Sequence, residues 1–231
     1  MLPKLIAVSI AGGILCLDRI VLQAMVSRPI VAAPVIGSIL GDAYTGLIAG
    51  AFIELLWIDR LPIGTYLPPN DTVVSIVLTA ASIESAHLIG GPSRELLVLS
   101  LLGTVPLGIL AQRLELWLGR GNEKLAAAAV SEAPRGDVRS VSRRHLFAIL
   151  RSYLLWVVLI FASLAAVIPA LAWLSPRLGT PITRGLTLLY GFLPLLGAAV
   201  ALNTISVRGV IPVFCAAFLC ASVIIGLLRS G

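Results

Sequence analysis

The chain has 231 residues, of which 58% are hydrophobic and only 12% are charged, and its mean hydropathy is +1.03. Soluble domains are about 45–50% apolar and about 25% charged, so this composition excludes an ordinary soluble domain and indicates a polytopic membrane protein. The net charge of +6 is concentrated between Arg113 and Arg151, which carry eight basic residues between them; this favours a topological signal over a nucleic-acid surface.

The first apolar segment covers residues 5–26 and is interrupted by the adjacent charges of Asp18 and Arg19. Such a pair marks either the end of a helix or a break within a membrane span, and the sequence leaves both readings open. The segment is predicted to be retained as the first membrane segment, because no small-residue cleavage pattern precedes a soluble domain.

Residues 30–58 are too long for one simple span. They are compatible with a tilted helix, with two short helices or with a re-entrant hairpin. The segment contains Gly37, Gly41, Gly46 and Gly50, whose spacing predicts a small-residue face on which a second helix backbone approaches closely.

Residues 59–71 contain three prolines and a glycine, so they predict a loop or an unwound stretch. Inside a membrane, such a stretch is tolerated only where it lines a cavity or is buried in protein. Further membrane segments are predicted at 72–90 and 96–111.

Residues 112–145 are the one clearly aqueous region, and they predict a basic cytoplasmic loop. Three more segments follow at about 146–174, 182–202 and 209–228. The expected fold is therefore a single all-α membrane domain over residues 1–231, with about six to eight membrane segments that include re-entrant or broken helices.

Asp42 and Glu54 are acids inside this apolar chain, where an insertion cost of about 2.5–3.5 kcal/mol for a carboxylate indicates a function. Carboxylates and amides bind hydroxyl groups strongly in a cavity of low dielectric constant, and aromatic rings offer flat faces to a sugar. The predicted substrate-binding residues are Arg28, Asp42, Glu54, Trp57, Tyr66, Asn70 and Asp71.

Some of these residues have simpler explanations. Arg28 is also explained as the neutralising partner of Asp42 or of a helix end, and Trp57 and Tyr66 as anchors at the membrane interface. No nucleophile–base pair and no nucleotide motif is present, and the three cysteines lie in apolar runs without a nearby histidine. No catalytic residue, cofactor or metal site is therefore predicted.

The run G-S-I-L-G-D-A-Y-T-G-L-I-A-G-A-F-I-E, from Gly37 to Glu54, resembles the signature of the IIC membrane subunits of mannose-type (mannose, fructose, sorbose) permeases of the bacterial phosphoenolpyruvate-dependent sugar phosphotransferase system (PTS). The preceding R-P at Arg28 and the following P-P-N-D, which ends at Asp71, also resemble this family. The specific likeness covers about residues 18–80.

The resemblance implies a multi-pass protein of the bacterial cytoplasmic (inner) membrane that binds and translocates a hexose-like sugar. It implies a homologous IID membrane subunit as partner, soluble IIA and IIB proteins that carry the phosphoryl group, and an oligomeric complex in the lipid bilayer. The IIB protein would phosphorylate the sugar, so the IIC chain itself needs no catalytic residue.

A second hypothesis is a membrane partner that does not transport, and that serves as a sensor or as a docking platform for a IIB-like protein. An integral-membrane enzyme has little support, because no catalytic constellation is present. The sequence does not name the sugar.

Overall fold

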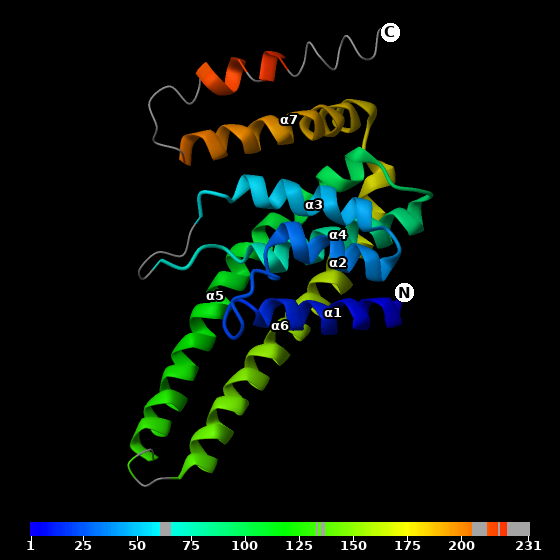
Figure 1. Ribbon diagram of the computed structural model, residues 1–231. Helices are drawn as coiled ribbons and strands as arrows, with labels where there is room; N and C mark the ends of the chain where they lie inside the picture. Colours follow the sequence, from blue (N-terminus) through cyan, green and yellow to red (C-terminus); the bar gives the residue numbers. More distant parts are fainter. Residues whose placement is uncertain (61–65, 133, 135–136, 205–211, 217, 221–231) are drawn as a thin grey trace.

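In the computed structural model, the described residues form seven α-helices of 12 to 39 residues and short helical stretches at 212–216 and 218–220, and they form no strand (Figure 1). The structure describes residues 1–231 except 61–65, 133, 135–136, 205–211, 217 and 221–231. The helices are α1 (Leu2–Leu17), α2 (Pro29–Leu40), α3 (Ala43–Leu56), α4 (Asp71–Ile89), α5 (Arg94–Glu132), α6 (Val138–Leu174) and α7 (Thr180–Thr204), with a short 3-10 helix at Ser175–Arg177. The prediction of an all-α fold is confirmed.

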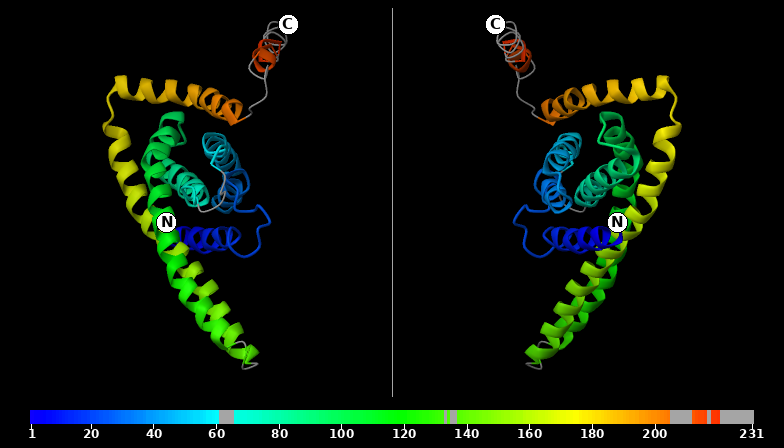
Figure 2. Two further views of the ribbon diagram at one scale, coloured as in Figure 1. Left: turned by 90° about the vertical axis from the view of Figure 1, so that its left-hand side faces the viewer. Right: turned by 90° about the vertical axis from the view of Figure 1, so that its right-hand side faces the viewer.

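Four of these helices, α4 to α7, are long and apolar enough to cross a membrane. The other three, α1 to α3, are apolar but have only 16, 12 and 14 residues. Helix α4 forms the centre of the bundle, because it packs against α1, α2, α3, α5 and α6 and is buried over most of its length. Figures 1 and 2 show α7 lying across one end of this bundle.

Residues 30–58 form two short helices, which excludes the alternative of a single tilted helix. Helices α2 and α3 pack along each other and are joined by a turn at Gly41 and Asp42. Gly41 ends α2 with a φ of +90°, a left-handed conformation that glycine adopts without steric cost.

Close contact between α2 and α3 depends on glycines. A Cβ atom on Gly46 would lie 2.5 Å from the carbonyl oxygen of Ala33, and one on Gly50 would collide with the carbonyl oxygen of Pro29. Gly50 lies four residues after Gly46 in α3, whereas its contact Pro29 lies four residues before Ala33 in α2. The two helices are therefore antiparallel. The prediction that these glycines serve helix packing is confirmed at both positions.

Helix α1 ends at Leu17, and Asp18 follows as its C-cap residue. The charged pair Asp18 and Arg19 therefore directly follows the end of a helix. The segment up to Arg28 then turns the chain back into α2, and α1 packs against α6 and α2.

Within the region predicted as a basic cytoplasmic loop, residues 112–132 belong to α5 and residues 138–145 belong to α6, so these described parts are helical. The distal halves of α5 and α6 form a two-helix arm that projects from the bundle (Figures 1 and 2). Alanine and long charged side chains favour helix, and an ion pair between Arg144 and Glu132 joins the two helices near the tip. The segment predicted at 209–228 lies largely outside the described residues.

Replacing Gly46 by alanine is expected to destabilise the protein by about 1–3 kcal/mol, because the new Cβ forces the α2 and α3 backbones apart. Gly103→Ala in α5 is the matched control: no atom lies within 4 Å of the added Cβ, so its effect is neutral or stabilising by up to about 1 kcal/mol. Thermal unfolding of the purified variants in detergent compares the two. Equal shifts of both variants would contradict the glycine contact.

Candidate functional site

A polar hollow of about 490 Å³ lies at the open end of the α2–α3 hairpin, opposite its turn. Its walls come from the α1–α2 segment, the end of α3, the proline-containing segment before α4, and α5. Its charged and amide side chains are Asp18, Arg19, Gln23, Arg28, Glu54, Arg60, Asp71 and Glu115. We call it the Glu54 hollow. Three arginines and four carboxylates thus meet at one place in an apolar bundle.

Two sets of ion pairs order the charges of the Glu54 hollow. Arg28 pairs with Glu54, which also accepts a hydrogen bond from the backbone N–H of Ile30 at 3.4 Å. Arg19 pairs with Asp71 and lies 4.0 Å from Glu115. Each carboxylate has about four lone-pair sites, so these pairs leave acceptor capacity for the hydroxyl groups of a ligand.

Asn70 is fully buried and lies behind this wall. Its side-chain oxygen accepts from the backbone N–H of Val73 at 3.0 Å and so caps α4, and its amide nitrogen donates to Glu115 at 3.1 Å. The backbone N–H of Asn70 also donates to the carbonyl oxygen of Gly108 at 3.0 Å. Asn70 therefore joins the start of α4 to α5 and orients Glu115.

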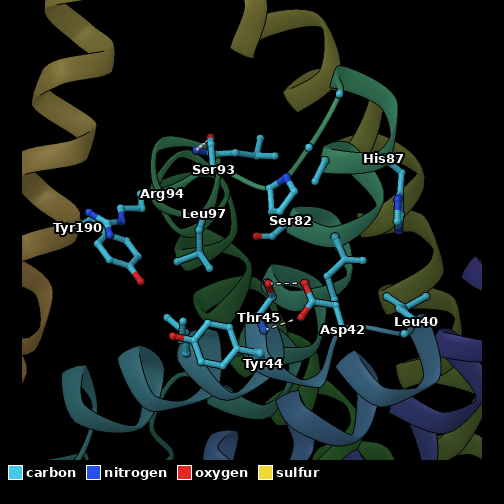
Figure 3. A pocket seen from close by; sticks show the side chains of 18 residues that line it. Leu40, Asp42, Tyr44, Thr45, Ser82, His87, Ser93, Arg94, Leu97 and Tyr190 are labelled. Carbon is cyan, nitrogen blue, oxygen red and sulfur yellow. Dashed lines mark hydrogen bonds between the residues drawn. The ribbon is translucent and has the colours of Figure 1, made fainter.

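A second hollow, of about 610 Å³, lies at the turn end of the hairpin (Figure 3). We call it the Asp42 hollow. Asp42 caps α3 by accepting from the backbone N–H of Thr45 at 3.0 Å and from its hydroxyl at 2.6 Å. Ser82 lies on the far wall, and among the described residues its buried hydroxyl has no hydrogen-bond partner. The Arg94 guanidinium lies 5.6 Å from the centre of the Tyr190 ring.

The structure separates the predicted site residues. Arg28, Glu54, Trp57 and Asp71 line the Glu54 hollow, whereas Asp42 lies at the opposite end of the hairpin. The suggested pairing of Arg28 with Asp42 is wrong, because the antiparallel hairpin places Arg28 beside Glu54.

The two predicted aromatic residues differ in their surroundings. Tyr66 is 47% exposed, and its only described polar contact is a donation from Arg60 at 3.5 Å. Trp57 is half-buried and packs against α5 at Gly108, where a Cβ atom would lie 3.1 Å from its ring. Trp57 is therefore the ring that borders the Glu54 hollow.

Comparison with known families decides what kind of protein carries these two hollows. The family model described as the sorbose-specific IIC component of the PTS matches residues 2–228. The chain belongs to this IIC family. It is therefore a multi-pass membrane subunit of a sugar PTS permease.

Relatives support the assignment over the whole length. The fructose permease IIC component of Bacillus subtilis (strain 168) is 23% identical over 220 residues, which cover 95% of this chain and 78% of the relative. A solved structure described as a membrane protein matches with a TM-score of 0.76 at 21% identity, over 100% of this chain and 93% of the other. The mannose transporter ManYZ, solved by cryo-EM in complex with microcin E492, contains a chain that matches with a TM-score of 0.64 at 21% identity. The match covers 100% of this chain and 92% of the other. These structures show the same fold.

Sequence reasoning missed the contribution of α5 to the site of this IIC chain. Glu115 was placed within the predicted aqueous loop, yet it faces Arg19 and Asn70. The buried residues Gly108, Ala111 and Leu118 recur at helical spacing, and Glu115 continues the same stripe. This periodicity was the available signal.

Asp18 was also missed as a structural centre of the hollow. It is 1% exposed, and its carboxylate accepts from the backbone N–H groups of Ala24 at 2.8 Å and Ser27 at 3.0 Å, and from the Ser27 hydroxyl at 2.9 Å. These bonds hold the turn in which Gln23 and Met25 adopt positive φ values. Burial tends to raise the pKa of Asp18, but the hydrogen bonds outweigh it and hold the pKa below its ordinary value.

Among the described residues, no group of three or more histidine, cysteine, aspartate or glutamate side chains is arranged to hold a metal ion.

The lowered pKa of Asp18 predicts a pH-dependent stability. At about pH 7 Asp18→Asn is expected to destabilise the turn by about 1.5–3 kcal/mol, because neutral asparagine accepts weaker hydrogen bonds. The wild type keeps this advantage above the unfolded-state pKa of about 3.9 and loses it as the pH falls through the lower folded-state pKa. Unfolding temperatures measured at several pH values should converge in acid. A constant difference between the two proteins would contradict the role of the charge.

Proposed function

We propose that the Glu54 hollow binds the sugar that this IIC subunit translocates. The observation that carries the proposal is the meeting of carboxylates, arginines and the Trp57 ring in one hollow beside the proline-containing segment. Its volume of about 490 Å³ lies within the range of about 300–1,000 Å³ that is usual for small-molecule sites. A hexose-like sugar is the proposed ligand class.

In this proposal Glu54 and Asp71 accept hydrogen bonds from neighbouring sugar hydroxyls, while Arg28 and Arg19 donate to ring or hydroxyl oxygens. Each arginine already orients a carboxylate, so the polar groups are arranged before the sugar arrives. Trp57 offers an apolar face to the ring of the sugar. Asn70 acts behind them by orienting Glu115. Tyr66 and Asp42 lie outside the hollow and are not assigned a contact with the sugar there.

The basic arm supports an orientation. Clustered arginine and lysine residues mark the cytoplasmic side of membrane proteins. Along α5, Glu115 is close to the arm, whereas Arg94 lies 21 residues before it, or about 32 Å at 1.5 Å per residue. This distance matches the hydrocarbon thickness of about 30 Å. The proposal therefore places the Glu54 hollow toward the cytoplasm and the Asp42 hollow toward the outer face.

A sugar held on the cytoplasmic side is accessible to a soluble phosphoryl donor. We propose the IIA and IIB proteins as soluble partners, a IID-type membrane subunit as the second half of the path, and the bacterial inner membrane as the location. The apolar residues exposed on α1 and α7 support an environment of lipid or of another membrane subunit, as do those on the other outer faces. The higher-order complex belongs to the same proposal.

Glu54→Gln is expected to lower sugar uptake at least tenfold, since it removes a charged acceptor worth about 1.5–3 kcal/mol per hydrogen bond. Uptake and phosphorylation are measured in membranes that carry the chain with its IID, IIA and IIB partners. Glu123→Gln is the matched control and should leave uptake unchanged, because Glu123 is exposed on α5 and lines neither the Glu54 hollow nor the Asp42 hollow.

The double variant Arg28→Gln with Glu54→Gln separates binding from ion pairing. If the pair serves only to stabilise the fold, the double variant should recover uptake lost by either single variant. Continued loss with normal insertion supports a sugar contact. Unchanged uptake in Glu54→Gln, or no uptake of any sugar by the complete system, would instead favour a sensor or docking partner.

A further inference from the structure

A third hollow, of about 480 Å³, lies on the arm between α5 and α6. Its polar lining consists of Arg120, Lys124 and Arg151, and its aromatic lining of Trp117 and Phe147. We call it the arm groove. It shares no residue with the Glu54 hollow or the Asp42 hollow, so the sugar pathway proposed above does not explain it.

The arm groove is a cluster of like charges. Arg120 and Lys124 are four residues apart on α5 and lie on one face of the helix, where two cations repel each other. Arg151 joins them from α6. Within the described part of the chain, no acidic side chain lines the groove, and none of these three cations forms an ion pair. An anion would relieve this repulsion.

The position of Arg151 is built into the packing of the arm. Its guanidinium lies over the Trp117 ring, 4.9 Å from the ring centre, and against the backbone of Gly121. Any side chain at Gly121 would collide with that guanidinium. The cation–π contact with Trp117 therefore favours this position of the guanidinium, and the absence of a side chain at Gly121 leaves space for it.

The groove lies just beyond the uncharged stretches of both helices, since its lining starts five residues after the stretch in α5 and ends at Arg151, directly before the stretch in α6. In α5 the residues 96–112 carry no charge, and in α6 the residues 152–174 carry none. These stretches are about 26 Å and about 35 Å long, which brackets the hydrocarbon thickness of about 30 Å. Trp117 and Phe147 are 56% and 55% exposed, as expected for rings at a membrane interface.

From these observations we infer that the arm groove binds the phosphate headgroup of an anionic phospholipid. The three cations face the phosphate, and the exposed faces of Trp117 and Phe147 lie along the start of the acyl chains. The negative surface potential of a cytoplasmic leaflet attracts basic segments next to the membrane, in agreement with the orientation proposed for the basic arm. The interfacial position favours a lipid over a soluble acidic partner.

The test is native mass spectrometry of the purified full-length chain titrated with phosphatidylglycerol and, separately, with phosphatidylcholine. The wild type should bind phosphatidylglycerol more tightly. Arg120→Gln with Lys124→Gln should weaken that binding about thirtyfold, because each basic residue near an anionic surface contributes about 1 kcal/mol, or about fivefold. Arg139→Gln with Arg143→Gln removes the same charge from exposed positions nearer the tip of the arm and should leave binding unchanged.

The inference would be overturned if the wild type bound the two lipids equally, or if both double variants lost binding to the same extent. It would also be overturned if inorganic phosphate protected the protein against thermal unfolding as strongly as phosphatidylglycerol does. The last result would assign the groove to a soluble anion. The comparison of lipids on the wild type decides the question even if a variant fails to fold.

Discussion

The approach of the α2 and α3 backbones is the contact on which the rest of the site depends. Gly46 and Gly50 bring α3 directly onto carbonyl oxygens of α2, so the two helices form a tight antiparallel pair. The chain reverses its direction between α2 and α3, and Gly41 lies in the turn that joins them. It thereby places Arg28, at the start of α2, beside Glu54, near the end of α3. A wider separation would leave both charges without this partner in an apolar bundle.

The same hairpin explains why the molecule has two polar hollows rather than one. A helix pair closed by a turn has two ends, and each end has backbone groups that need polar partners. At the turn, Asp42 meets this need by capping α3. At the open end, charges from the α1–α2 segment, α4 and α5 gather near Glu54 and neutralise one another. The polar groups of the open end are less committed to the helix backbone, which makes that end the better candidate for a ligand.

Much of the fold was predictable from composition, hydropathy and glycine spacing. The all-α architecture, the close packing at Gly46 and the non-helical backbone of residues 66–70, which contain two prolines, follow from local rules. The arm was not predicted, because charge marks exposure to water but does not distinguish a loop from a solvated helix pair. Residues 112–145 carry both signals, and the mutual packing of α5 and α6, with Glu132 and Arg144 paired across it, determines the outcome.

The sequence by itself determined which acids are costly in a membrane, and therefore that Glu54 needs a polar environment. It also determined that the chain resembles a sugar permease subunit. Only the tertiary structure decided which charges meet, because pairs such as Arg19 with Asp71 join residues 52 positions apart. It separated Asp42 from Glu54, and it brought Asp18 and Glu115 to the hollow. Local patterns describe one helix at a time, whereas a binding site is formed where several helices pack together.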